Sequence, residues 1–189
     1  MIVPPGGNQF DQPKPDAGMF LGTLIDVADL GFVTPKNPNF PGPPVHRIKL
    51  VWVLDKKDKD GKPFIVTQVP PLKMVDGGKG SKKSRLYEIW EGVLGTAPAV
   101  PYETEDLIGH SNLLYLAKEG DYVVIKGFMP VPSGQVPPKA PVDFVRDKDD
   151  PKRQAARAAK KQTQTTTTAP VQTAPAIPAP VEDDSEIPF

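Results

Sequence analysis

The sequence predicts an all-β domain with one helix, followed by a tail that does not fold on its own. Two observations lead to this fold class. Between residues 19 and 130, five segments show the apolar and polar alternation of strands, and Gly- or Pro-rich turns separate most of them. Residues 162–181 carry no charge and are mostly Thr, Gln, Ala and Pro, too poor in large apolar side chains to offset the entropy of folding.

The first two strands follow a loose N-terminal arm. Residues 1–18 contain four Pro and three Gly and few large apolar groups, so we expect no regular structure there. Apolar residues in 19–33 indicate a long bent strand, with Gly22 as the expected position of a bulge or bend. The Pro-rich residues 34–44 predict a loop, and 45–54 form the clearest strand in the chain.

The alternation in the second strand predicts two different faces. One face carries Ile48, Leu50, Trp52 and Leu54, and the other carries Arg47, Lys49, Val51 and Val53. Because successive side chains of a strand point to opposite sides, the first set should face the core and the second should face outward. The charged residues 55–62 then predict a hairpin turn.

A third strand and a helix are expected next. Residues 64–74 predict the strand, although Pro70 and Pro71 lack N–H donors and place its second half at an edge or a bulge. Residues 76–83 predict a Gly/Lys loop. The helix should begin after an N-cap at Ser81 or Ser84 and stop at Gly95. Its apolar face comprises Leu86, Ile89, Trp90 and Val93.

Two more strands complete the domain. A helical turn is predicted at 104–109, and strands at 112–118 and 122–130 flank a turn at 119–121. Three strands, a helix and two strands is the element order of a five-stranded OB-fold barrel with its helix between strands 3 and 4. OB-folds bind oligonucleotides on the outer face of their first strands and on the adjoining loops.

The chain therefore divides into four predicted parts. These are a flexible arm (1–18), an OB-fold nucleic-acid-binding domain (19–146), a disordered linker (147–181) and an acidic protein-docking tip (182–189). The linker opens on a basic run, in which 152–161 predict a short helix.

Composition excludes several classes of protein. The chain has no Cys and two His, which argues against disulfide scaffolds and most transition-metal sites, and we expect no catalytic residues, metal or cofactor. The sequence also shows no apolar run of membrane length and no secretory signal, so a cytoplasmic protein without membrane contact is expected. The formal charge of zero hides a positive excess in residues 45–94.

The last eight residues join four acidic side chains to an apolar end. The predicted docking residues are Asp183, Asp184, Glu186, Ile187, Pro188 and Phe189. Phe189 would fill a small apolar pocket of a partner, while the acids steer the encounter with its basic rim. An ordinary solvated acidic tail is the alternative, since charge runs are usually that.

This end resembles the C-terminal tip of the bacterial single-stranded DNA-binding proteins, in which an acidic run closing on Ile-Pro-Phe follows a disordered linker and an OB-fold domain. The domain also resembles a group of small phage OB-fold proteins over residues 19–130. The similarity lies in Leu-Ile-Asp-Val-Ala-Asp-Leu-Gly (24–31), Arg-Ile-Lys-Leu-Val-Trp-Val-Leu (47–54) and Asp-Gly-Lys-Pro-Phe (60–64), and it departs from the pattern at Pro70 and Pro71.

Binding single strands requires cations along the backbone and aromatic faces for the bases. The predicted cationic contacts are Arg47, Lys49, Lys73, Lys79, Lys82, Lys83, Arg85 and Lys126, for which solubility is the alternative role. The predicted stacking residues are Phe40, Trp52, Phe64, Tyr122 and Phe128. The periodicity of its strand favours a core position for Trp52 over a stacking role.

These observations predict a single-stranded DNA-binding protein that coats DNA during phage replication, recombination and repair and recruits partner enzymes through its tip. An OB-fold adaptor that binds protein and mimics the tip of a host binding protein is the second hypothesis. A metal-dependent nuclease is the third. The sequence leaves open the partner of the tip, homo-oligomer formation and the choice among single-stranded DNA, RNA and duplex.

Overall fold

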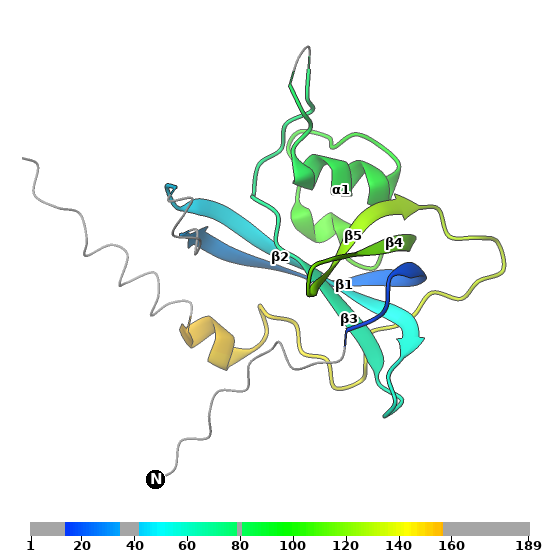
Figure 1. Cartoon of the computed structure of the whole chain (residues 1–189). Helices are drawn as coiled ribbons and strands as arrows, with labels where there is room; N and C mark the ends of the chain where they lie inside the picture. The colour runs from blue at the N-terminus through cyan, green and yellow to red at the C-terminus, as the bar shows by residue number, and fades with distance from the viewer. Residues whose placement is uncertain (1–13, 35–41, 79–80, 157–189) are drawn as a thin grey trace, which may run out of the picture.

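A computed structural model describes residues 14–34, 42–78 and 81–156 of the chain. These residues form one five-stranded antiparallel sheet with strand order β3-β2-β1-β4-β5. The five strands are β1 (Gly18–Val33), β2 (Val45–Lys57), β3 (Pro63–Gln68), β4 (Ser111–Glu119) and β5 (Tyr122–Met129). The helix α1 (Arg85–Leu94) and the 3-10 turn η1 (Thr104–Leu107) separate β3 from β4 (Figure 1). The predicted all-β class and element order are confirmed.

The long strand β1 lies at the centre of the sheet and bends at two bulges. It pairs with β4 through its first half and with β2 from Gly22 to Val33. The pairing register with β2 shifts between Leu24 and Asp26 and again between Asp29 and Gly31. The bulge predicted at Gly22 is therefore wrong, since Gly22 pairs in register with Leu54.

Close packing explains the glycine at position 22. A Cβ atom added there would lie 2.4 Å from Cδ1 of Leu114 and 3.2 Å from Cδ2 of Leu54. Both leucines are buried in the core, so neither can move aside without opening space elsewhere. Glycine is required at position 22 because the side chains of Leu114 and Leu54 leave no room for a Cβ atom. The reason is not a turn conformation.

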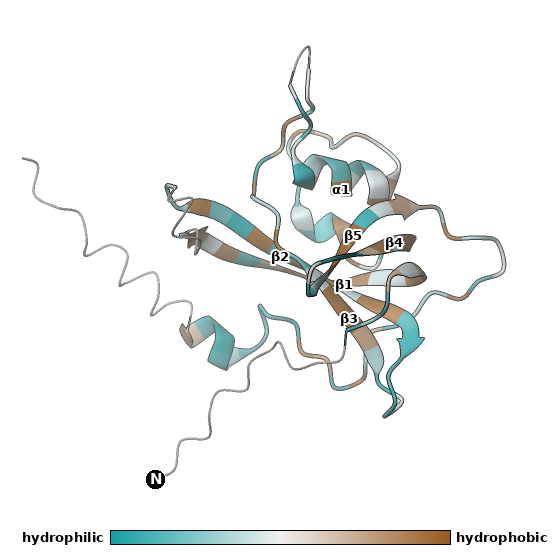
Figure 2. Cartoon of the chain, in the orientation of Figure 1, coloured by the Kyte–Doolittle hydropathy of each residue, from teal (hydrophilic) through white to brown (hydrophobic). Residues whose placement is uncertain are grey.

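The main core lies between one face of the sheet and α1. Ile48, Leu50, Trp52 and Leu54 of β2 are all buried there, as the alternation of β2 predicts. The apolar face of α1 covers them with Leu86, Ile89, Trp90 and Val93, again as predicted. Figure 2 shows the hydrophobic residues concentrated in the strands, whereas the turn between β2 and β3 is hydrophilic.

The ends of α1 follow the predicted cap chemistry. Ser84 is the N-cap, and its hydroxyl oxygen accepts a hydrogen bond from the N–H of Tyr87. Gly95 ends the helix in the left-handed conformation, with φ 72°, which glycine adopts without strain. The side-chain amide of the buried Asn112 donates to the carbonyls of Gly92 and Val93 and so fixes the last turn of α1 to β4.

The third strand is shorter than predicted. It ends at Gln68, two residues before Pro70. Neither Pro70 nor Pro71 has an N–H group to donate to the strand ladder, so regular pairing stops there. Pairing continues beyond it only as an isolated bridge between Arg47 and Pro71. The strand β2, in contrast, runs three residues beyond its predicted end at Leu54.

The segment after β5 forms a layer that the sequence did not predict. Residues 141–153, which we call the strap, cross the face of the sheet opposite α1 (Figure 1). Phe144 packs there against a second apolar cluster made of Ile25, Val51 and Val53 with Ile65. Residues 151–156 are helical, in agreement with the predicted short helix as far as the structure describes it.

Buried ionic groups pin the strap to β1. One carboxylate oxygen of Asp26 accepts from Nε of Arg146 at 3.3 Å, and the other accepts from the N–H of Asp147 at 2.9 Å. Asp26 is almost inaccessible to solvent and needs these partners, and the equally buried carboxylate of Asp147 pairs with Lys49 and Arg153. The predicted boundary at residue 146 divides this contact, and the packed domain extends beyond it.

Candidate nucleic-acid interface

The predicted binding face on the outer side of β1, β2 and β3 is largely covered. The strap occupies it, with Phe144 over Val51 and Val53. Lys49, which shares this face, is paired with Asp147 at 3.6 Å, and its side chain is only 15% exposed. Lys49 is therefore a structural cation, and its predicted role as a free phosphate contact is wrong for this conformation.

Two predicted stacking residues belong to the core. Trp52 is fully buried and cannot present a ring face to a base, so the preference for a core position is confirmed and the stacking role is wrong. Phe128 is partly buried, with its ring centroid 6.1 Å from that of Trp52. It also lies directly under α1, because a Cβ added at Gly92 would come within 2.7 Å of the Phe128 ring.

Cationic residues gather around a pocket at the start of α1. The pocket has a volume of about 310 Å³, and its lining includes the predicted residues Lys73, Lys82 and Arg85 together with Ser81 and Ser84. Lys73 and Lys82 are exposed, and the positive end of the α1 dipole adds to their charge. The pocket is therefore an electropositive surface suited to phosphate groups.

The neighbouring cations are already engaged. Lys83 pairs with Glu91 at 2.5 Å, and this hydrogen bond raises the pKa of the Lys83 ammonium above its ordinary value. Arg85 pairs with Glu88 at 2.9 Å and also donates to the carbonyl of Ile125. These two side chains fasten the pocket to α1 and β5.

The remaining predicted residues are distributed around the sheet. Arg47 donates to the carbonyl of Val69 at 2.9 Å and holds the segment that follows β3. Lys126 pairs with Glu119. Tyr122 is 64% exposed at the turn between β4 and β5, and Phe64 is partly buried against the main core. Phe40, Lys79 and the tip residues Glu182–Phe189 lie outside the described residues.

Four further residues, none of them predicted as site residues, lie at the same end of the sheet as Tyr122 and Phe64. The ammonium of Lys14 lies 5.2 Å from the centre of the Tyr122 ring and donates to the carbonyl of Asp121 at 2.7 Å. The ammonium of Lys56 lies 5.4 Å from the centre of the Phe20 ring. Lys118 lines a pocket with Lys14 and Tyr122. No local pattern marks these residues, because strand pairing brings them together.

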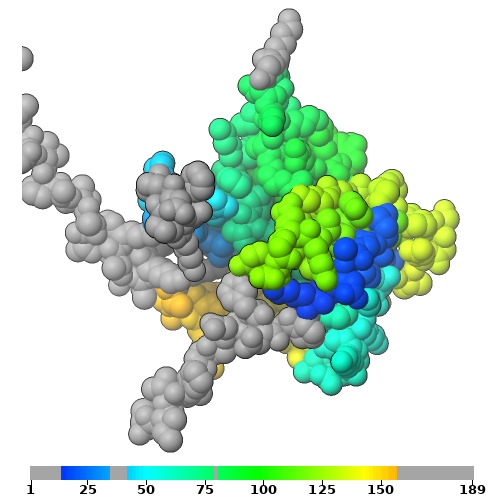
Figure 3. Space-filling model, viewed as in Figure 1, coloured from blue at the N-terminus to red at the C-terminus, as the bar shows by residue number. Residues whose placement is uncertain are grey.

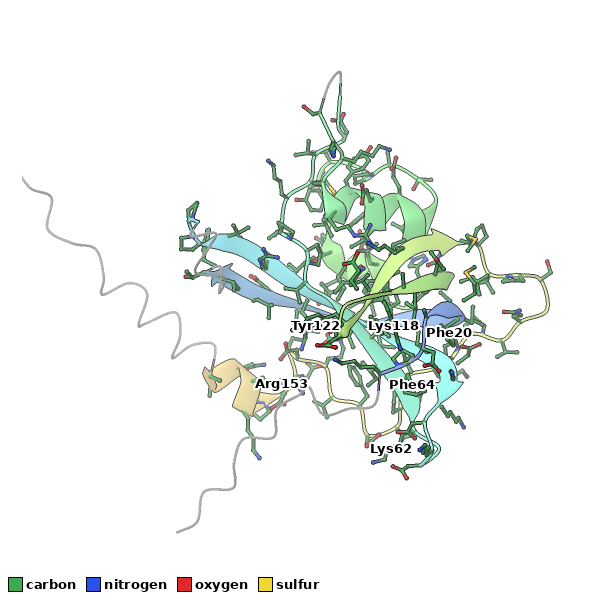
Figure 4. The ribbon with its side chains drawn as sticks, in the orientation of Figure 1. Phe20, Lys62, Phe64, Lys118, Tyr122 and Arg153 are labelled. Atoms are coloured by element: carbon green, nitrogen blue, oxygen red, sulfur yellow. The ribbon has the colours of Figure 1, made fainter. Side chains whose placement is uncertain are left out.

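Figure 4 shows Phe20, Phe64, Lys118 and Tyr122 on one side of the molecule, while Arg153 lies apart on the strap. Figure 3 shows the first described residues against the β4–β5 hairpin on the same side, as the bond from Lys14 to Asp121 requires. We call this set the aromatic rim. It consists of Phe20, Phe64 and Tyr122 with Lys14, Lys56 and Lys118.

Charge pairs join the strap to η1 as well as to β1. Glu105 binds Lys148 at 2.8 Å and Arg146 at 2.9 Å. The hydrogen bond from Lys148 lowers the pKa of the Glu105 carboxyl below its ordinary value, and Arg146 acts in the same direction. A lowered carboxyl pKa stabilises the fold above the unfolded-state pKa, and this contribution is lost as the pH falls through the folded-state pKa.

Comparison with protein-family models, with curated proteins and with solved structures gave no match to this chain. In the described part of the chain, no helix combines the length and the apolar character that crossing a bilayer requires.

Proposed function

We propose that the chain is a single-stranded DNA-binding protein of the phage type, built on an OB-fold barrel, that coats exposed DNA and recruits other enzymes through its C-terminal tip. The observation that carries the proposal is the strand order β3-β2-β1-β4-β5 with α1 between β3 and β4. This is the order in which an OB-fold winds its strands, and OB-folds commonly hold oligonucleotides.

Contacts between the two edge strands support closure into a barrel. The side-chain amide of Gln68 in β3 donates to the carbonyl of Ile125 in β5 at 2.8 Å. Arg85, at the start of α1, donates to the same carbonyl. The first bond joins the two edges of the sheet, which otherwise expose unpaired backbone groups, and the second joins α1 to the edge strand β5. The helix covers one side of the enclosed core.

The distribution of charge and of aromatic rings supports nucleic acid as the ligand. Exposed lysines surround the pocket at the start of α1, and others lie beside the aromatic rim. A strand that follows both would meet cations for its phosphates and rings for its bases, which is the combination that single-strand binding uses. The acidic Ile-Pro-Phe end of the sequence supports the recruitment of partners.

The first experiment is fluorescence anisotropy of a labelled oligo(dT) titrated with the full-length chain at several salt concentrations. We expect binding that weakens with salt, with a slope of log K against log salt of about −0.7 for each phosphate neutralised. Duplex DNA of the same length is the comparator and should bind more weakly, because its bases are not free to stack. Absence of binding to both at low salt would exclude the proposal.

Deleting Glu182–Phe189 should tighten the binding of oligo(dT) at low salt by about 3- to 10-fold, because the acidic residues compete with phosphates for the same cations. The difference should disappear as the salt concentration rises. The variant Phe189→Ala keeps all four acidic side chains and should bind DNA as the full chain does. Equal affinity of the truncated and full-length chains at low salt would contradict the competition.

A further inference from the structure

The aromatic rim is a surface formed by the end of the sheet that carries the β4–β5 turn. Pairing of Gly22 with Leu54 places Phe20 beside Lys56 at the end of β2, and pairing of Lys57 with Pro63 brings Phe64 to the same end. Phe20, Phe64 and Val123 pack against the same core cluster, and Tyr122 precedes Val123 at the turn. We propose that the aromatic rim is the surface on which this protein stacks the bases of a single strand. The inference rests on the proposed function and specifies its site.

The strap covers the alternative face of the sheet and so favours the aromatic rim. Bases and phosphates that approached the outer face of β2 would meet Phe144 and the buried pair of Lys49 and Asp147. Opening that face would break the hydrogen bonds from Arg146 and from the N–H of Asp147 to Asp26, and it would expose the apolar cluster around Phe144 to water. The bonds that hold the strap to Asp26, Lys49 and Glu105 involve no residue of the aromatic rim, so binding at the rim leaves these bonds in place.

Cations lie over two of the three rings of the aromatic rim. Lys14 lies over Tyr122 and Lys56 over Phe20, each at a distance typical of a cation–π contact. Both lysines are exposed and have flexible stems, so a phosphate can draw the ammonium off the ring while a base takes its place. The exchange favours DNA, because base stacking is stronger than an exposed cation–π contact.

The third lysine provides a free charge between the rings. Lys118 is exposed at the end of β4, and in the described part of the chain no carboxylate pairs with its ammonium. By contrast, Lys56 pairs with Asp16 at 3.3 Å, a contact across an exposed surface that a phosphate can replace. The aromatic rim thus offers three rings and the unpaired cation of Lys118 at one end of the sheet.

The test uses the substitutions Tyr122→Leu and Phe64→Leu, which keep an apolar side chain and remove the π-face. Each should weaken the affinity of the full-length chain for oligo(dT) by about 5- to 100-fold, the range that loss of one stacked base gives. Tyr122 is 64% exposed, so its replacement leaves the core intact. The matched control is Tyr115→Leu, because Tyr115 is 47% exposed on β4 and lies outside the aromatic rim. It should change the affinity by less than about 2-fold.

An abasic oligonucleotide of equal length separates stacking from charge. The wild-type chain should prefer oligo(dT) over the abasic strand, and Tyr122→Leu should reduce that preference while leaving affinity for the abasic strand unchanged. The variant Lys14→Gln should instead lower the salt slope for both strands, by about 0.7 if the lysine neutralises one phosphate.

The outcomes distinguish the site from the function. If the wild type binds oligo(dT) tightly and both Tyr122→Leu and Phe64→Leu bind it equally well, the aromatic rim is not the stacking site, although the proposed function stands. If Tyr115→Leu weakens binding and Tyr122→Leu does not, the bases stack on the outer face of β4 and the assignment is wrong. If the wild type binds neither strand, the function and the site both fail.

Discussion

Replacing Arg146 with methionine should lower the free energy of unfolding by about 3 kcal/mol, because it leaves Asp26 buried without its cationic partner. Methionine preserves most of the apolar stem, so the loss reports the charge rather than the packing. The value lies at the lower end for a broken buried ion pair, since Asp26 keeps its hydrogen bond from the N–H of Asp147 and the Arg146 side chain is 24% exposed.

Urea unfolding followed by tryptophan fluorescence measures this change. The signal is suitable because Trp52 and Trp90 are both buried. Lys148→Met is the matched control, because Lys148 also belongs to the strap but is 49% exposed and pairs with the exposed Glu105, and it should cost less than about 1 kcal/mol. Equal losses from the two substitutions would mean that the ionic contact at Asp26 does not hold the strap.

Replacing Gly92 with alanine should destabilise the protein by about 2 kcal/mol, even though alanine is the better helix former. The added Cβ would lie 2.7 Å from Cδ2 and 2.9 Å from Cβ of Phe128. A Cβ atom cannot swing away as the end of a long side chain can, so α1 must move from β5. The intrinsic gain of alanine over glycine in a helix, up to about 1 kcal/mol, offsets only part of this cost.

The control for that substitution is Gly127→Ala. Gly127 lies next to Phe128 in β5, but a Cβ added there meets only Cβ of Tyr115, at 3.9 Å, which is ordinary contact. We expect a change of less than about 1 kcal/mol in the same urea titration. A Gly92→Ala variant as stable as the wild type would show that the gap between α1 and β5 can widen at little cost.

Sequence patterns predicted the elements whose signals are local. The alternation of β2 identified both of its faces, and the cap residues Ser84 and Gly95 marked the ends of α1 correctly. Pro70 and Pro71 warned that the third strand would be short, and it ends at Gln68. Strand alternation, helix caps and prolines act on residues close to them in the sequence. A short window of sequence is therefore enough to predict their effect.

The strap could not be predicted in this way. Phe144 stands in a Pro-rich stretch after the last predicted strand, where no element was expected, and its apolar partners Ile25 and Val51 lie far back in the chain. Asp26 was the one indication of the strap, because a carboxylate inside a buried apolar strand requires a partner. The sequence does not show which cation is that partner. The lysine at position 49 was assigned to DNA for the same reason, since its partner Asp147 is remote.

The sequence singled out two of the three rings in the aromatic rim. Phe64 and Tyr122 were predicted stacking residues, whereas Phe20 and the lysines Lys14, Lys56 and Lys118 were not predicted. Phe20 has the periodicity of a core residue, and only the end of the sheet exposes it. Whether a ring at the last position of an apolar face is covered depends on the length of neighbouring strands, which no local pattern determines.

The bond between Asp26 and the N–H of Asp147 joins residues 121 positions apart. Contacts between residues so far apart in the sequence form late in folding, because closing the long intervening loop costs conformational entropy. During synthesis the sheet can therefore assemble from β1 to β5 while Asp26, Ile25 and Val53 still face solvent, and the strap seals them only after the ribosome has released it.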